Sequence, residues 1–201
     1  MNPTPVPQTK YNQIVECLNV ILKSGSINEL ELKRYKNEAE KLKNHNPSEA
    51  FTLLGIIACI EKKIEEMHSY HKKALTYSNN PIYLLQYATS LINVELFDDA
   101  YPYALEAFKN DQNNLQIIDA LITITYEIDN YEELITYTSL WKKIKGEPHP
   151  YATFLEDNDD KLSQMIINFD ELIKNKPELV VKPDPKLIKL VDELVDGVDI
   201  T

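Results

Sequence analysis

A chain of 201 residues, 43% hydrophobic and 26% charged, is long enough for one sizeable folded domain or for a short array of small units. Only four glycines accompany eleven prolines, and alternating runs of β-branched residues are scarce, so we expect an all-α protein. The formal net charge of −11 repels phosphate backbones and anionic lipid surfaces, which argues against nucleic acid and membranes as partners.

The N-terminal segment, residues 1–9, contains three prolines and is predicted to be extended and mobile. It has neither the basic lead nor the apolar core of a secretory signal, and two cysteines, Cys17 and Cys59, are too few for a disulfide framework. The longest apolar run, residues 53–60, covers eight positions, whereas a membrane-spanning helix needs roughly 20. We therefore expect a cytoplasmic protein.

Residues 10–47 are predicted to form a helix pair that is either a degenerate repeat or an N-terminal cap. Apolar residues recur at helical spacing in the first half, and Gly25 is expected to end that helix. The apolar positions are Ile14, Val15, Leu18, Ile21 and Leu22. The charged stretch that follows, residues 27–46, is expected to be the antiparallel partner of this helix.

Residues 48–148 contain an internal repeat of about 34 residues, which is the length of one helix-turn-helix unit. The stretch that begins at residue 46 aligns with the one that begins at residue 80, since both open with Asn-Pro and both end with Asn-Asn. Two antiparallel helices approach closely only where side chains are small, so the small residues of this region should mark the lines of helix contact. They are Gly55, Ala58, Ala74, Ala88, Ala100, Ala104 and Ala107.

These units resemble the tetratricopeptide repeat family, and the string FDDAYPYALEAF at residues 97–108 is the part most similar to the family's pattern. The matching positions are Phe51, Leu54, Gly55, Ala58, His71 and Ala74, then Leu84, Tyr87, Ala88, Leu91, Phe97, Ala100, Ala104 and Ala107, then Leu121 and Tyr131. Thr125, Leu134 and Trp141 depart from the pattern. The resemblance implies about three repeats stacked into an α-solenoid of antiparallel helix pairs, with flanking N- and C-terminal helices. Because proline is tolerated only in the opening turn of a helix, we expect a late helix start near Pro102.

The resemblance also implies that a peptide binds on the concave face, which is lined mainly by the first helix of each unit. The positions carried over are Thr52, Ile56, Ile60, Leu85, Thr89, Ile92, Asn93, Asp119, Thr123, Tyr126 and Glu127. No lysine or arginine occurs among them, so such a groove should prefer an apolar or basic protein segment. Alternatively, these positions contact the protein's own flanking helices.

No pattern in the sequence points to catalysis, a cofactor or a metal. Glu65, His68 and His71 share one predicted helix, but the first and last lie about 120° apart around its axis. Cys59 lies within an apolar helix with no neighbouring base, and the chain has no glycine-rich phosphate loop. We therefore expect a protein that is not an enzyme and that has no catalytic residue, cofactor or metal.

The C-terminal part is predicted to comprise a helical segment at residues 149–177. Residues 178–201 are predicted to form a proline-rich tether with an amphipathic helix that either caps the array or recognises a partner.

Taken together, the sequence favours a chaperone-like module that binds another protein. One alternative is an immunity or antitoxin-like inhibitor of a basic toxin. Another is a structural subunit that associates with copies of itself.

Overall fold

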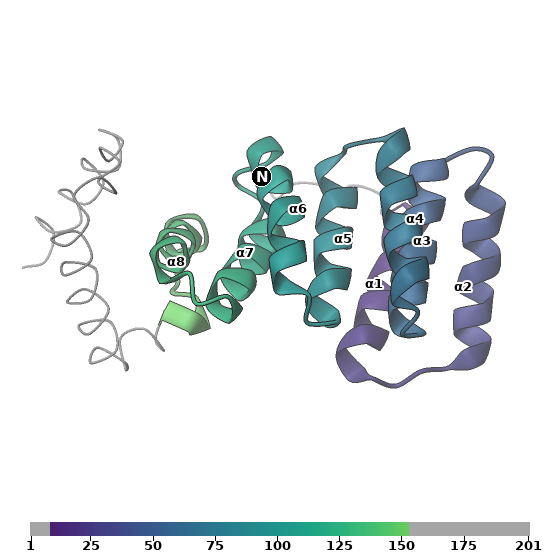
Figure 1. Ribbon diagram of the computed structural model, residues 1–201, viewed down its shortest axis with the longest axis horizontal. Coiled ribbons are helices and arrows are strands. Elements are labelled where there is room, and N and C mark those ends of the chain that lie inside the picture. The colour runs from purple at the N-terminus through teal and green to yellow at the C-terminus, as the bar shows by residue number, and fades with distance from the viewer. Residues whose placement is uncertain (1–8, 153–201) are drawn as a thin grey trace, which may run out of the picture. The chain divides into compact units, whose positions relative to one another are not determined.

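The computed structural model describes residues 9–152, which form eight α-helices and no strand (Figure 1). The helices are α1 (Lys10–Ser24), α2 (Glu29–Leu42), α3 (Pro47–Ile60), α4 (Ile64–Tyr77), α5 (Pro81–Asn93), α6 (Phe97–Asn110), α7 (Leu115–Glu127) and α8 (Tyr131–Lys145). The chain divides into two units, residues 1–152 and residues 153–201. The predicted mobile lead before residue 9, most of the helical segment 149–177 and the whole of the tether and tail 178–201 lie outside the described residues.

Helices that follow one another in the chain pack as pairs: α3 with α4, α5 with α6, and α7 with α8. Figure 1 shows α2 at one end of the row of described helices and α8 at the other. The all-α prediction is confirmed for these residues, and the sequential pairing is consistent with a helical repeat array. The small residues predicted to mark helix contacts are buried, as Ala74, Ala88 and Ala104 illustrate.

Asparagines begin the first helix of each unit at even intervals along the chain. Asn46, Asn80 and Asn114 are the N-cap residues of α3, α5 and α7. The side chains of Asn80 and Asn114 accept hydrogen bonds from the backbone N–H groups of residues 82 and 116, at 2.9 and 3.0 Å. A capping side chain satisfies a backbone donor that the helix leaves unpaired, so these residues set the helix starts. Their interval is the repeat length that the sequence predicts.

The turns inside the three units have one backbone conformation in common. Lys62, Glu95 and Asp129 have positive φ angles of 58°, 61° and 56°, and each occupies the equivalent place in its unit. In each turn the next backbone N–H donates to the carbonyl five residues earlier, at 2.9, 3.0 and 2.8 Å. These bonds close the C-terminal end of the first helix and direct the chain back as the second helix. The repeat is therefore present in the backbone as well as in the side chains.

Helix α1 packs mainly on α3 and less closely on α2. Both helices pack on α3, and α1 lies beside α3 and α5 (Figure 1). The apolar stripe of α1 and the α3 side chains that it meets form one core: Tyr11, Ile14, Val15, Leu18 and Ile21 with Ile56, Ile57 and Ile60. The side chains of Ile14 and Tyr35 line a cavity of about 320 Å³ between α1 and α2, and Lys10 of α1 forms an ion pair with Glu38 of α2.

The expected late helix start near Pro102 is wrong, because α6 begins at Phe97 and Pro102 lies inside the helix. Proline has no N–H, so the carbonyl of Asp98 loses its usual partner four residues on. Both Asp98 and Pro102 are exposed, so water can bond to that carbonyl and the helix continues.

Candidate functional site

The predicted groove residues fall into three groups. Thr52, Ile56 and Ile60 of α3 are buried beneath α1, and Thr52 has no exposed surface at all. In this structure they contact the protein's own N-terminal helix, as the alternative interpretation allows. The sequence could not predict this contact. The pattern of α1 is that of an ordinary amphipathic helix, and it does not indicate which helix α1 covers.

Six predicted positions line a single groove: Leu85, Thr89, Ile92 and Asn93 of α5, and Asp119 and Thr123 of α7. Gln86, Gln116 and Ala120 complete these two walls, and the groove has a volume of about 320 Å³. Its third wall is α1, through Asn19, Leu22 and Lys23. Sequence reasoning missed this wall, although Asn19 and Lys23 flank the apolar stripe of α1 at helical spacing. The groove therefore contains a basic residue, Lys23, which the predicted lining lacks.

Two amide side chains in the groove have buried oxygen atoms without a hydrogen-bond partner among the described residues. These atoms are the Oε1 of Gln86, whose residue is 7% exposed, and the Oδ1 of Asn19. Neighbouring polar groups are satisfied locally, because Asn93 Nδ2 donates to the carbonyl of Thr89 at 2.8 Å and Thr123 Oγ1 donates to that of Asp119 at 3.0 Å. A buried acceptor without a donor costs about 1–3 kcal/mol, so these two amides lower the stability of the folded chain.

The remaining two predicted positions lie toward the C-terminal end of α7. Tyr126 stacks on Tyr151, with ring centroids 4.5 Å apart and planes 7° from parallel. Glu127, the last residue of α7, is exposed and does not line the groove. Residue 151 of the chain itself therefore covers the Tyr126 ring.

His149 fixes this covering segment to α7. The backbone N–H of Tyr151 donates to His149 Nδ1 at 3.2 Å, and His149 Nε2 lies 3.0 Å from Asp119 Oδ1. An Nδ1 that accepts leaves the proton on Nε2, which donates it to the Asp119 carboxylate. The Trp141 ring meets the imidazole edge-on at 4.8 Å. Asp119 is thus shared between the groove and this contact.

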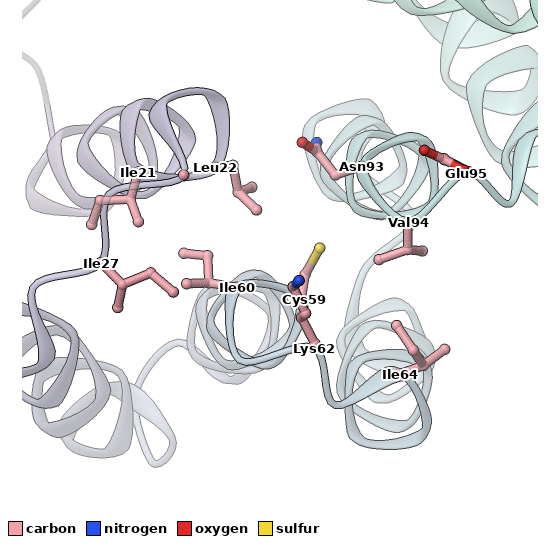
Figure 2. Close-up of a pocket in the computed structure, with 11 residues that line it drawn as sticks. Ile21, Leu22, Ile27, Cys59, Ile60, Lys62, Ile64, Asn93, Val94 and Glu95 are labelled. Atoms are coloured by element: carbon pink, nitrogen blue, oxygen red, sulfur yellow. The ribbon is translucent and has the colours of Figure 1, made fainter.

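A second cavity, of about 540 Å³, lies at the C-terminal ends of α1, α3 and α5 (Figure 2). Its lining is largely aliphatic: Ile21, Leu22, Ile27, Ile60, Ile64 and Val94, together with Gly25, Cys59, Lys62, Asn93 and Glu95. Leu22 and Asn93 line both this cavity and the groove. The two cavities therefore adjoin along the C-terminal half of α1.

The two histidines of α4, His68 and His71, take part in packing. His71 is buried, its Nε2 lies 2.9 Å from Ser90 Oγ, and its ring stacks on Tyr87 at 4.8 Å. Burial, and to a lesser extent His68, lower the pKa of His71 to about 3. His68 Nδ1 lies 2.7 Å from the Tyr87 hydroxyl. Within residues 9–152, no three histidine, cysteine or acidic side chains are grouped so that they could hold a metal ion.

Cys59 is the one cysteine that lines the second cavity. It is almost fully buried, and its Sγ lies 3.4 Å from the carbonyl of Ser90. Burial raises the pKa of this thiol to about 11, so the thiolate that a nucleophile needs is disfavoured.

Comparison with known proteins adds no assignment: no family model and no curated protein matches the chain. The resemblance to tetratricopeptide repeats therefore depends on the residues of this chain alone. No helix in the part of the chain that the structure describes is both long and apolar enough to span a membrane.

Proposed function

We propose that this chain is a non-enzymatic protein-interaction module, built as a tetratricopeptide-like α-solenoid, which binds a segment of a partner protein in the groove between α1, α5 and α7. The observation that carries the proposal is that six positions predicted from the sequence line one groove of about 320 Å³ between these helices. Partly exposed polar side chains on its walls, Thr89 and Gln116 among them, can bond to the backbone of a bound segment.

The assignment to a tetratricopeptide-like array is supported by two features that recur from unit to unit. The N-cap asparagines and the positive-φ turns each return once in every repeat, at equivalent places. The buried alanines add the small-residue contacts that such helix pairs need. A stack of helix pairs buries apolar faces that no single pair could bury, and it leaves a groove along the first helices.

The lining of the groove favours an apolar segment over a basic one. Its charged residues are Lys23 and Asp119, and His149 already contacts the Asp119 carboxylate. The groove therefore lacks the acidic excess that would attract a basic ligand, in spite of the net charge of −11 on the whole chain. Binding and shielding an apolar segment of another protein is a chaperone-like role.

Self-association is a second candidate function, and exposed aliphatic residues near the α1–α2 connection favour it. Val20, Ile27 and Leu30 are 63%, 50% and 80% exposed. Exposed aliphatic residues of this kind can join copies of the chain.

The test is affinity purification from the organism that makes the protein, with a groove-blocked variant, Thr89→Arg with Gln116→Arg, beside the unaltered chain. Both residues line the groove and neither is fully buried. The matched control is Ser69→Arg on α4, which is exposed and outside the groove. We expect the same partner to be captured by the unaltered chain and the control, and lost by the groove-blocked variant.

Capture by a groove-blocked variant that keeps its helical circular dichroism would refute a groove-bound partner. Sedimentation of the purified chain as a partner-free oligomer, dissociated by Ile27→Lys, would instead favour self-association.

A further inference from the structure

A short segment after α8, residues 147–152, lies against α7, and we call it the strap. Two of its side chains contact α7: His149 meets Asp119, and Tyr151 stacks on Tyr126. Asp119 and Tyr126 are about two helical turns apart, so they lie on one side of α7. The sequence predicts both as positions that bind a partner. The strap therefore covers part of a predicted binding face with the chain's own residues.

The strap makes the kinds of contact that a bound peptide would make. His149 is 6% exposed, and its Nε2 donates a hydrogen bond to Asp119 Oδ1 at 3.0 Å. Two residues later, the Tyr151 ring covers the ring of Tyr126 almost in parallel, with centroids 4.5 Å apart. This face of α7 thus accepts a hydrogen-bond donor and an aromatic ring that are close together in one segment.

Asp119 belongs to the groove as well as to the strap contact. Its side chain lines the groove and is 57% exposed, whereas the His149 side chain is 7% exposed. A group that lies in the groove can therefore reach this carboxylate and compete with the imidazole for it. An ammonium or guanidinium group has a full positive charge, which the neutral imidazole lacks, and it would bind the carboxylate more strongly.

A second carboxylate lies beside the stacked rings. Burial raises the pKa of Tyr151 and the charge of Glu127 raises it further, so Glu127 is close to the Tyr151 hydroxyl. Glu127 is the exposed last residue of α7, and α7 contains no basic residue. The C-terminal end of a helix favours positive charge, and so does the face of an aromatic ring such as that of Tyr126. Without the strap, this end of α7 would attract a cationic side chain.

The strap is small enough to be displaced. Gly146 ends α8 in the left-handed conformation, with a φ angle of 82°, and so separates the strap from the helix. Glu147 and Pro148, which follow it, are exposed. A stable protein interface engages roughly 20–30 residues on each side. A partner segment that occupies both the groove and the face of α7 therefore gains more contacts than it displaces.

On the basis of the proposed function, we propose that the strap is an autoinhibitory contact, which occupies the binding face of α7 until a partner segment displaces it. The apolar part of that segment lies in the groove, an arginine or lysine binds Asp119, and an aromatic ring stacks on Tyr126. The closed strap keeps the Asp119 carboxylate engaged, so a segment that is only apolar does not displace it. The basic residue beside an aromatic one is thus the feature that distinguishes the partner.

The probe is a display library of random linear 12-residue peptides, selected on the full chain with His149→Ala and Tyr151→Ala, the strap-released variant, and then synthesised individually. We expect the selected peptides to have an arginine or lysine near an aromatic residue. They should bind the strap-released variant about tenfold more tightly than the unaltered chain, because the strap competes with them only in the latter. The matched control, His45→Ala with Tyr77→Ala, also removes one imidazole and one phenol, both exposed and outside the groove, and should bind like the unaltered chain.

The charge of the partner has its own test. Asp119→Asn, added to the strap-released variant, keeps the size of the side chain but removes its charge. The selected peptides should bind this variant about tenfold more weakly than the strap-released variant, and high salt should weaken their binding to the latter. Equal affinity for the two variants would overturn the assignment of a basic residue to Asp119.

Displacement can also be followed in the unaltered chain. Trp141 is the only tryptophan in the sequence, and its ring meets His149 edge-on at 4.8 Å. Saturation with peptides selected on the unaltered chain should therefore shift the tryptophan emission as the imidazole leaves. Emission that stays unchanged at saturation would mean that the strap remains in place and would overturn the inference, even if the strap-released variant failed to fold.

The outcomes separate this inference from the proposed function. Peptides that bind the unaltered chain and the strap-released variant equally well, but do not bind the Thr89→Arg, Gln116→Arg variant, would overturn autoinhibition and leave the groove in place. A selection that enriches no peptide on either protein, or only peptides that the groove-blocked variant binds equally well, would overturn the proposed function and this inference together.

Discussion

Acidification should destabilise this protein through one buried imidazole. His71 packs on Tyr87 and faces Gly55, and its only polar contact among the described residues is Ser90. Burial lowers its pKa from an ordinary value of 6.5 to about 3 in the folded protein. The unfolded chain therefore takes up the proton first. This contribution to stability is complete above about pH 6.5 and is lost as the pH falls toward 3.

The magnitude follows from proton linkage. Each pH unit below 6.5 removes up to about 1.4 kcal/mol of folding free energy, so at pH 4.5 the loss is about 2–3 kcal/mol. A domain of this size has a total stability of about 5–15 kcal/mol, so a loss of this size is readily measured.

The assay is urea unfolding followed by circular dichroism at several pH values from 7.5 to 4.5, on the unaltered chain and on His71→Phe. Phenylalanine keeps a ring against Tyr87 but cannot bind a proton, and every other titrating group is common to both proteins. Their difference in unfolding free energy should therefore change by about 2–3 kcal/mol across this range. Parallel curves would refute the reasoning, whatever the absolute stability of the variant.

Two further predictions concern packing. Gly55→Ala should destabilise the protein by about 1–3 kcal/mol in urea unfolding, because a Cβ there would lie 2.6 Å from the His71 ring; an equal or higher unfolding midpoint would show that the ring can move aside. Leu18→Ala, in the fully buried contact of α1 with α3, should cost about 2–5 kcal/mol, whereas Val20→Ala on the exposed face should change stability by no more than about 0.5 kcal/mol. Equal effects of the two alanines would mean that α1 does not pack on α3 as described.

The features that the sequence predicts well are those that depend on local chemistry. An asparagine before a helix caps it wherever the helix later packs, so Asn80 and Asn114 locate helix starts directly. Alanines at close helix contacts are required by steric distance alone, and those of the repeats are buried. The all-α class and the sequential helix pairs could therefore be read from the chain.

The features that the sequence did not predict depend on which surfaces meet. The stripe of α1 shows that the helix is buried on one side, but not that it covers Thr52 and Ile60 and forms a wall of the groove with Lys23. The contact of His149 with Asp119 joins positions 30 residues apart that have no local pattern in common. The two orphaned amides could not be recognised either, since a missing hydrogen bond becomes visible only when the surroundings of the side chain are known.

The matching turns at Lys62, Glu95 and Asp129 have a consequence for how such a chain can change in length. Because the backbone enters and leaves each turn in the same way, a stretch cut or duplicated between two equivalent turn residues rejoins without a change in direction. A gain or loss of one whole repeat would therefore preserve the succession of helices and the turns that join them. Lengthening by whole modules is thus a route by which a protein of this design can extend the surface it offers without rebuilding its interior.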